Sequence, residues 1–308
     1  MGEVRILFAG SPEAALPALE VVADVADSLA VMSQPDKPVG RKKVLTATPV
    51  SSWALERGIA LHRPVDHDGI AQTVSDYAPE LAITVAYGRI LRPNVLDMPP
   101  AGWWNLHFSL LPRWRGAAPV QNALLAGDTE TGVSVFRLDE GVDTGPLLGQ
   151  RSHPVRRGMN AGELLTELSH TGAELLRDTL ASFHQGQHSF AGQSGEATHA
   201  PKLDRQVGRI LPNDSLEMAL RRFGATTPEP GCFVSLAQGQ QTLRILAATA
   251  LPDPTSPGDG RIMPIASGVG ISLAGGFLLL ESVVPAGKKA MASADWWRGV
   301  HGEHTIDA

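Results

Sequence analysis

The sequence predicts an α/β protein with a doubly wound, mainly parallel sheet followed by a small β-rich domain. Short, continuously apolar segments alternate with amphipathic ones through the first half of the chain, as in buried parallel strands that are separated by helices. Beyond residue 203 the strand-like pieces are short and separated by Gly and Pro, which favours a small barrel or sandwich. A length of 308 residues suits two such domains.

Strands and helices are expected to alternate along the first domain. The apolar runs predict strands at residues 4–9, 28–32, 81–86, 103–108, 133–138 and 147–155. The amphipathic segments predict helices at residues 14–25, 47–57 and 69–77. Ligands of such sheets bind beyond the carboxyl ends of the parallel strands, so we expect the active residues to follow strand ends.

A long helix is expected to close the first domain. Asn160 and Glu163 have the spacing of a helix-capping pair, and apolar residues then recur at helical spacing as far as Phe183. The next stretch is polar and rich in Gly, Gln, His and Ser without periodicity, which is typical of a linker. These patterns divide the chain into a first domain at 1–186, a linker at 187–203 and a C-terminal domain at 204–308.

Composition and charge exclude several classes of protein. The formal net charge of -6 disfavours a general polyanion binder, so a nucleic-acid contact would have to come from a local basic patch. Cys232 is the only cysteine, which excludes an internal disulfide framework, and no histidine spacing indicates a metal site. The N-terminus lacks the pattern of a signal peptide, and the apolar stretches are too short to cross a bilayer. We expect a cytoplasmic protein without a catalytic metal or a membrane partner.

The densest group of chemically useful side chains lies between Asn105 and Pro119. If residues 103–108 form a strand, Asn105 and His107 project from the same face at its end. An amide N–H can stabilise an oxyanion, and an imidazole can move the protons that an attacking amine loses and a leaving amine gains. The pair suits acyl transfer, whereas the structural alternative is a turn-capping Asn beside a buried histidine.

A glycine-rich loop carries three acidic residues, Asp139, Glu140 and Asp143. One carboxylate held near His107 would fix the tautomer of the imidazole and stabilise its charged form. The alternative is that these acids only form turns, because Asp side chains bond readily to nearby backbone. The loop therefore indicates catalysis only in combination with the Asn105 and His107 pair.

Together these segments resemble the formyltransferases that use 10-formyltetrahydrofolate. The similarity covers nearly the whole chain and includes residues 8–12, 33–43, 85–91, 105–119 and 139–145. Carried over position by position, the resemblance implies that Asn105, His107 and Asp143 form the catalytic group of a Rossmann-like formyltransferase domain. It also implies that the folate co-substrate is held by residues that follow two strands: Tyr87, Gly88, Ile90, Leu91, Ser109, Leu110, Leu111 and Pro112.

Two features resemble the members of this family that act on tRNA. One is the basic loop with Arg41, Lys42 and Lys43, and the other is the C-terminal region, which is similar to the family's OB-type domain. The resemblance implies a monomer that transfers the formyl group to the α-amino group of methionyl initiator tRNA. The product, formylmethionyl-tRNA, would serve translation initiation. It also implies that Arg41, Lys42 and Lys43 contact the tRNA. Phe108 departs from the small residue usual at its position and would narrow the folate pocket.

Three alternative functions are compatible with parts of this pattern. The acceptor could be a small amine, such as an amino sugar nucleotide or glycinamide ribotide, or water could hydrolyse the formylfolate. Neither reaction needs the C-terminal domain or the basic loop. A non-catalytic RNA-binding protein with the same fold is the third alternative, and the intact set of Asn105, His107 and Asp143 argues against it.

Overall fold

A computed structural model describes residues 4–40, 43–237, 239–300 and 304–308. The chain forms two compact units, and each takes up more than one stretch of sequence. The first unit consists of the residues up to Gly116 together with Glu130–Pro154 and Leu165–His199. The second consists of Ala117–Thr129, Val155–Leu164 and the residues from Ala200 onward.

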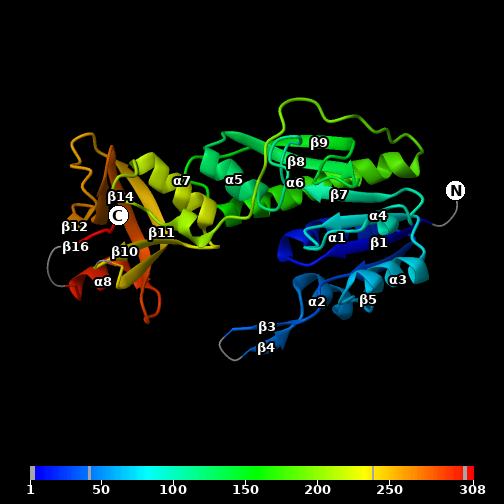
Figure 1. Ribbon diagram of the computed structural model, residues 1–308, viewed down its shortest axis with the longest axis horizontal. Coiled ribbons are helices and arrows are strands. Elements are labelled where there is room, and N and C mark those ends of the chain that lie inside the picture. The colour runs from blue at the N-terminus through cyan, green and yellow to red at the C-terminus, as the bar shows by residue number, and fades with distance from the viewer. Residues whose placement is uncertain (1–3, 41–42, 238, 301–303) are drawn as a thin grey trace. The chain divides into compact units, whose positions relative to one another are not determined.

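The first unit is built on a seven-stranded sheet (Figure 1). In spatial order the strands are β5 (Ala60–His62), β2 (Ser28–Met32), β1 (Arg5–Gly10), β6 (Leu81–Val85), β7 (Trp103–His107), β8 (Glu130–Arg137) and β9 (Leu147–Pro154). Strands β5 to β7 in this order run parallel, whereas β8 and β9 are antiparallel to their neighbours. The predicted doubly wound, mainly parallel sheet is confirmed.

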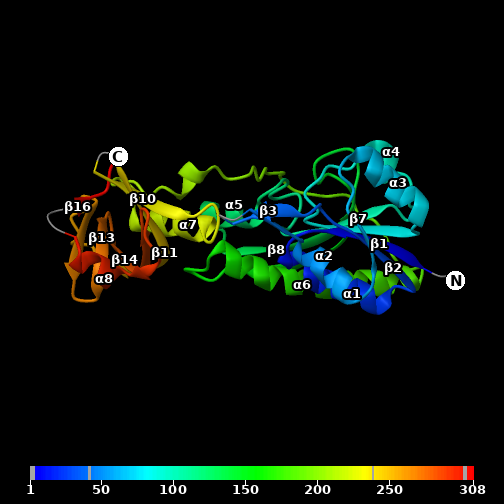
Figure 2. The same cartoon turned by 90° about the horizontal axis from the view of Figure 1, so that it is seen from below.

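Helices cover both faces of this sheet. Figure 2 shows α1 (Leu16–Val25) and α6 (Ala161–His184) on one side, and α3 (His67–Tyr77) and α4 (Pro93–Leu96) on the other. Two adjacent tryptophans of β7 pack against helices on opposite faces of the sheet, because successive side chains of a strand point to opposite faces. The indole of Trp103 donates a hydrogen bond to Val95 O of α4, and Trp104 packs edge-on against Phe183 of α6. Both rings are fully buried.

The helices begin where the sequence supplies capping groups. Thr48 caps α2 (Pro49–Glu56) by accepting from Ser51 N, and Asp66 caps α3 by accepting from Gly69 N. At the start of α6, Asn160 and Glu163 exchange hydrogen bonds of 3.0 Å each, so the predicted capping pair is confirmed.

A two-stranded hairpin interrupts the alternation after β2. It consists of β3 (Lys37–Val39) and β4 (Val44–Thr46), which pair only with each other among the described strands. All six of these strand residues are exposed. We call residues 37–46 the hairpin.

The second unit contains a curled antiparallel sheet of the OB-like kind. Its strands, in spatial order, are β10 (Cys232–Leu236), β11 (Gln241–Pro252), β14 (Gly276–Pro285), β13 (Gly268–Leu273), β12 (Arg261–Ile265) and β16 (His304–Thr305), and β15 (Met291–Ala292) pairs with β14. The helical elements of this unit are α5 (Pro119–Ala126), η2 (Arg205–Gly208), α7 (Leu216–Thr226) and α8 (Ser293–Arg298). The β-rich second domain expected from the sequence is therefore confirmed.

Packing in the second unit joins segments that are distant in sequence. Arg221 of α7 donates to the carbonyl of Ala126 at the end of α5, so a helix that precedes β8 belongs to this unit. Cys232 is fully buried in its core, and burial raises the pKa of the thiol to about 12. Cys232 is therefore a packing residue of this core.

Candidate active site

Strand β7 carries the first two residues of the candidate site. Trp104 and Leu106 point to the α6 side, where Leu106 lies close to Gly172. Asn105 and His107 therefore share the opposite face, at the carboxyl end of a parallel strand. This is the arrangement that the sequence predicted. Asn105 is half-buried and His107 is buried.

Both ring nitrogens of His107 face oxygen atoms. Nε2 lies 2.9 Å from the carbonyl oxygen of Trp114, and because a carbonyl can only accept, this nitrogen carries a hydrogen and donates. Nδ1 lies 3.7 Å from Oδ2 of Asp143, which is close enough for an ion pair but too long for a hydrogen bond. Phe136 packs edge-on against the ring, with the centroids 6.4 Å apart. The imidazole is thus oriented from several sides.

Asp143 reaches His107 because its loop folds back over the sheet. The loop leaves β8 next to β7, where Leu138 N donates to Trp103 O. Its carboxylate then accepts a 2.7 Å hydrogen bond from Gly116 N. Of the three acids in the loop, Asp143 is the one beside the imidazole. Asp139 instead accepts from Gly141 N and from the hydroxyl of Thr144, and Glu140 is exposed.

The return of this loop depends on a glycine. A Cβ atom on Gly145 would lie 1.8 Å from the carbonyl oxygen of Arg137, closer than any real contact allows. Asp143 itself adopts a positive φ of 53°, which is uncommon for a residue with a side chain, although Asp tolerates it better than most. The loop therefore needs a glycine at position 145 and a residue that tolerates positive φ at position 143. It also needs further contacts that hold its shape.

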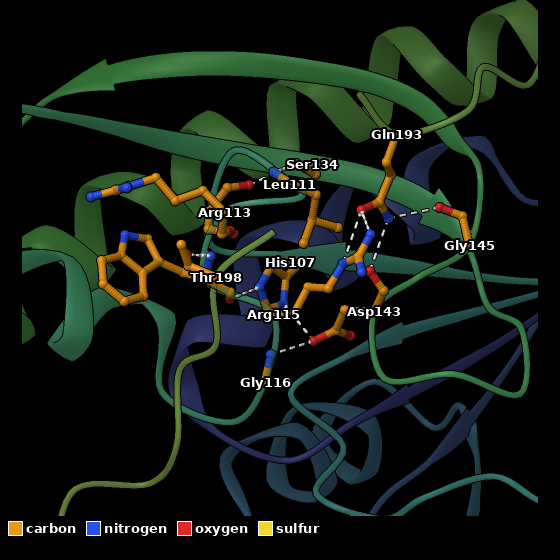
Figure 3. A network of polar contacts seen from close by, with 12 residues as sticks. His107, Leu111, Arg113, Arg115, Gly116, Ser134, Asp143, Gly145, Gln193 and Thr198 are labelled. Atoms are coloured by element: carbon orange, nitrogen blue, oxygen red, sulfur yellow. Dashed lines mark hydrogen bonds and ion pairs between the residues drawn. The ribbon is translucent and has the colours of Figure 1, made fainter. Parts of the chain in front are cut away.

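The predicted folate segment after β7 is fixed by a buried hydroxyl. Ser134 Oγ on β8 accepts from Leu111 N at 3.1 Å (Figure 3). The same hydroxyl donates to Ser109 O at 2.7 Å. Gln150 of β9 donates to both Leu111 O and Ser134 Oγ, each at 2.9 Å. Ser109, Leu111 and Pro112 are buried, and Leu110 is half-buried. Phe108, which we expected to narrow the folate pocket, is buried as well.

The second predicted folate segment follows β6, the strand beside β7. Its first residue, Tyr87, is buried, and burial raises the pKa of its phenol to about 12. Gly88 is exposed, Ile90 is 82% exposed and Leu91 is half-buried. Since β6 and β7 are parallel neighbours, the two predicted folate segments leave the sheet at the same edge.

Several polar residues at this edge had not been predicted as site residues. Ser11 Oγ and Gln34 Nε2 both donate to the carbonyl of Tyr87, and Arg89 donates to Gln34 Oε1. Ser11 and Gln34 follow β1 and β2, so they could have been found from their positions after strand ends. The contact between the Trp114 carbonyl and His107 could not be predicted in this way, because the type of a loop residue does not indicate which groups its backbone contacts.

The predicted tRNA contacts are placed only in part. Arg41 and Lys42 lie outside the described residues, whereas Lys43 is exposed between the strands of the hairpin.

In the described part of the chain no group of three or more His, Cys, Asp or Glu side chains could hold a metal ion. The helices described here are also too short or too polar to span a membrane.

The geometry is suited to acyl transfer. Asn105 offers an amide donor, His107 can move a proton, and the Asp143 carboxylate faces the imidazole that would become charged. Asn105 and His107 share one face at the carboxyl end of β7, Asp143 faces the imidazole, and two loop segments leave the sheet at this edge.

Solved structures share this fold at low sequence identity. HypX from Aquifex aeolicus in complex with tetrahydrofolic acid has a TM-score of 0.68 and 17% identity, over 96% of this chain and 47% of that one. WlaRD, a sugar 3N-formyl transferase crystallised in the presence of dTDP and 5-N-formyl-THF, has a TM-score of 0.66 and 16% identity, over 94% of this chain and 100% of that one.

Sequence comparison gives the family. The profile of the formyl transferases matches residues 12–180, and the profile of the formyl transferase C-terminal domain matches residues 202–301. A methionyl-tRNA formyltransferase of Paenarthrobacter aurescens is 43% identical over 96% of this chain and 97% of its own length. That of Thermus thermophilus is 40% identical over 96% of both chains. The chain belongs to the formyl transferase family and, within it, to the methionyl-tRNA formyltransferases.

Proposed function

We propose that this protein transfers the formyl group of 10-formyltetrahydrofolate to the α-amino group of methionyl initiator tRNA, with Asn105, His107 and Asp143 as the catalytic group. The observation that carries the proposal is the placement of His107, whose Nδ1 lies 3.7 Å from the Asp143 carboxylate, on the same strand face as Asn105. The match to methionyl-tRNA formyltransferases over 96% of the chain supports the choice of acceptor.

The reaction needs a proton acceptor and an oxyanion donor. The neutral α-amine attacks the formyl carbon and forms a C–N bond, which gives a tetrahedral intermediate with a negatively charged oxygen. Asn105 donates a hydrogen bond to that oxygen, a contribution worth about 10²- to 10³-fold in rate in other acyl-transfer enzymes. The bond to N10 of the folate then breaks, and N10 takes up the proton that the amine has lost.

His107 carries that proton on Nδ1. Nε2 is bonded to the Trp114 carbonyl, whereas the 3.7 Å gap to Asp143 leaves Nδ1 without a hydrogen bond to the carboxylate. Proton uptake there would create an imidazolium cation directly beside the Asp143 carboxylate, which compensates its charge. Asp143 thus contributes without exchanging a proton with substrate.

The two edge segments would bind the folate in different ways. The polar groups of Ser109 and Leu111 are already bonded to neighbouring residues, so these residues shape the wall of the site. Half-buried Leu110 and the exposed Gly88 and Ile90 are available for direct contact. The hydroxyl of Tyr87 is buried without a hydrogen-bond partner among the described residues, which fits a polar co-substrate bound beside it.

We also assign the second unit and the basic residues Arg41, Lys42 and Lys43 to tRNA binding in a cytoplasmic monomer. The sugar formyl transferase WlaRD aligns over 94% of this chain. The choice of a tRNA acceptor therefore rests on the basic residues and on the match to methionyl-tRNA formyltransferases, and not on the mere presence of a second unit. Guanidinium and ammonium groups neutralise phosphates, and Arg41 can additionally bond a base edge or a phosphate in bidentate fashion.

One assay tests the proposed function. Purified protein is mixed with 10-formyltetrahydrofolate, and release of tetrahydrofolate is followed with and without methionyl initiator tRNA. We expect release to require the charged tRNA and to match the formation of formylmethionyl-tRNA one to one. Equal release without tRNA would instead establish a formylfolate hydrolase, and release with an amino sugar nucleotide but not with tRNA would establish a small-amine formyltransferase.

A further inference from the structure

The polar segment that the sequence assigns to a linker is attached at two places to the first unit, which holds the candidate active site and which we call the catalytic unit. We call residues 187–199 the strap. Near its start, Ala191 and Leu147 exchange backbone hydrogen bonds of 2.7 and 2.9 Å. Near its end, Thr198 accepts from Arg115 N at 2.9 Å and donates its own N–H to Pro112 O at 3.3 Å.

Gln193 uses its whole amide group between these two attachments. Its Nε2 donates to the backbone carbonyls of Asp143 and Gly145 at 2.9 and 2.8 Å. Its Oε1 accepts from Nε and from a terminal nitrogen of Arg115 at 3.1 and 2.6 Å. Figure 3 shows the side chain reaching from the strap to the Asp143 loop. Two donors and two acceptor sites are the full capacity of a Gln amide, so its orientation is fixed by its partners.

Thr198 makes the corresponding contact on the other side of the imidazole. Its hydroxyl accepts a 2.9 Å hydrogen bond from Trp114 N. Trp114 and Asp143 both have positive φ, at 62° and 53°, a conformation that a residue with a side chain keeps only where its surroundings enforce it. These are the two residues whose oxygens face Nε2 and Nδ1 of His107.

We propose that Gln193 and Thr198 are positioning residues that hold the two oxygen partners of His107 in place, so that the strap is a working part of the active site. Gln193 fixes the backbone of Asp143, and Thr198 fixes that of Trp114. The inference rests on the proposed function, because it concerns the reaction assigned to His107. Neither side chain needs to touch substrate.

Four variants of the full-length protein separate this role from a merely structural one. Gln193→Glu keeps the size of the side chain and its acceptors for Arg115, but it places a carboxylate against two carbonyls that need donors. Thr198→Val removes the hydroxyl at nearly constant volume, whereas Thr198→Ser retains it. Gln187→Ala is the matched control, since Gln187 is an exposed amide in the same strap.

Steady-state kinetics of formyl transfer to methionyl tRNA provide the readout. We expect kcat to fall about 10- to 100-fold in Gln193→Glu and by a smaller factor in Thr198→Val, since displacement of a catalytic group by about 1 Å can cost 100-fold. KM for the formylfolate should stay within about threefold, because the lost interaction acts on the transition state. Thr198→Ser should recover most of the kcat that Thr198→Val loses, and Gln187→Ala should match the wild type.

A double-mutant cycle tests whether Gln193 acts through Asp143. Asp143→Asn retains an acceptor for Gly116 N but removes the charge. If Gln193 only positions Asp143, adding Gln193→Glu to Asp143→Asn should cause little further loss of kcat. Full multiplicative losses in the double variant, or a wild-type kcat in Gln193→Glu, would overturn the proposal.

The outcome is separable from that of the proposed function. A wild-type protein that does not formylate tRNA contradicts the function and not the geometry. An active wild type with unaffected strap variants contradicts the positioning role alone. Thermal unfolding of each variant provides the structural check, because a loss of kcat at unchanged unfolding temperature cannot be attributed to misfolding.

Discussion

The strap and the hairpin have very different surroundings. Both contain glycine and polar residues and lack a long apolar run, so the sequence assigns neither of them to the core. The strap pairs with Leu147 and with residues 112–115 of the catalytic unit, and Gln193 and Thr198 are turned partly inward. The described residues of the hairpin instead pair within it, and its apolar side chains Val39, Val44 and Leu45 are 56%, 59% and 69% exposed.

The difference shows that the destination of the hydrogen bonds decides what a polar segment does. A two-stranded hairpin with no hydrophobic face to cover is marginally stable at best, and it leaves its side chains available for a partner. A segment that bonds to separate loops holds those loops together instead. These surroundings fit the roles proposed above, catalysis for the strap and tRNA binding for the hairpin, and the following predictions test that division.

The largest effect is expected at His107, whose two oxygen partners come from the segments that the strap contacts. His107→Ala should lower kcat by about 10³-fold or more, while tRNA binding and the unfolding temperature change little, because the imidazole acts mainly in the transition state. Asn105→Ala should cost about 10²- to 10³-fold. The losses should not multiply in a combined variant, since residues that act as one unit are not additive. Rapid-quench measurement of formylmethionyl-tRNA provides the rates, and near-normal turnover in His107→Ala would refute the catalytic assignment.

A smaller effect is expected in the loop that the strap pairs with. Ser134→Ala leaves the buried Leu111 N without the acceptor that it has in the structure. We expect a loss of about 1–3 kcal/mol in the free energy of unfolding, together with a higher KM for the formylfolate. Urea denaturation and initial-rate kinetics measure the two quantities. An unchanged stability would mean that this network does not hold the segment.

The hairpin should affect tRNA and little else. Arg41→Ala is expected to lower kcat/KM for methionyl initiator tRNA by about tenfold, and by more than Lys42→Ala or Lys43→Ala, with Arg41→Lys recovering only part of the loss. Each lost phosphate contact should also reduce the salt-dependence slope of binding by about 0.7–0.9. Equal, small effects at all three positions would make this region a general electrostatic attractor and assign specificity to the second unit.

The smallest effect is expected from the exposed apolar residues of the hairpin. Leu45→Ser should change the free energy of unfolding by less than about 0.5 kcal/mol, because a side chain that is 69% exposed contributes little to the core. Chemical denaturation measures this value. A loss above 1 kcal/mol would show that the hairpin is anchored after all, and that the contrast with the strap is wrong.

The sheet and its candidate catalytic residues were predictable from local signals. Continuous apolar runs mark the buried parallel strands, and Asn105 and His107 follow from the two-residue repeat of a strand. Two unpredicted helices also carried usable signals. Pro119 begins α5 and Gly127 ends it in the left-handed conformation, and Ser215 caps α7.

The anchoring of the strap was not predictable in this way. Gln193 contacts Arg115 and Thr198 contacts Trp114, and these partners are 78 and 84 residues away in sequence. No sequence periodicity connects Gln193 or Thr198 to these partners. The composition of the strap is also that of a free linker. The left-handed backbone of Trp114 likewise has no signal in the residue type, because it is imposed by neighbouring loops.

Amide hydrogen exchange of the full-length protein, with and without methionyl initiator tRNA, tests the division between strap and hairpin most directly. We predict that the amides of Ala191, Arg115 and Thr198, which are hydrogen-bonded in the structure, are protected in the free protein and change little on tRNA binding. Residues 37–40 and 43–46 should exchange fast in the free protein and become protected with tRNA. Fast exchange in the strap, or a hairpin indifferent to tRNA, would contradict the account.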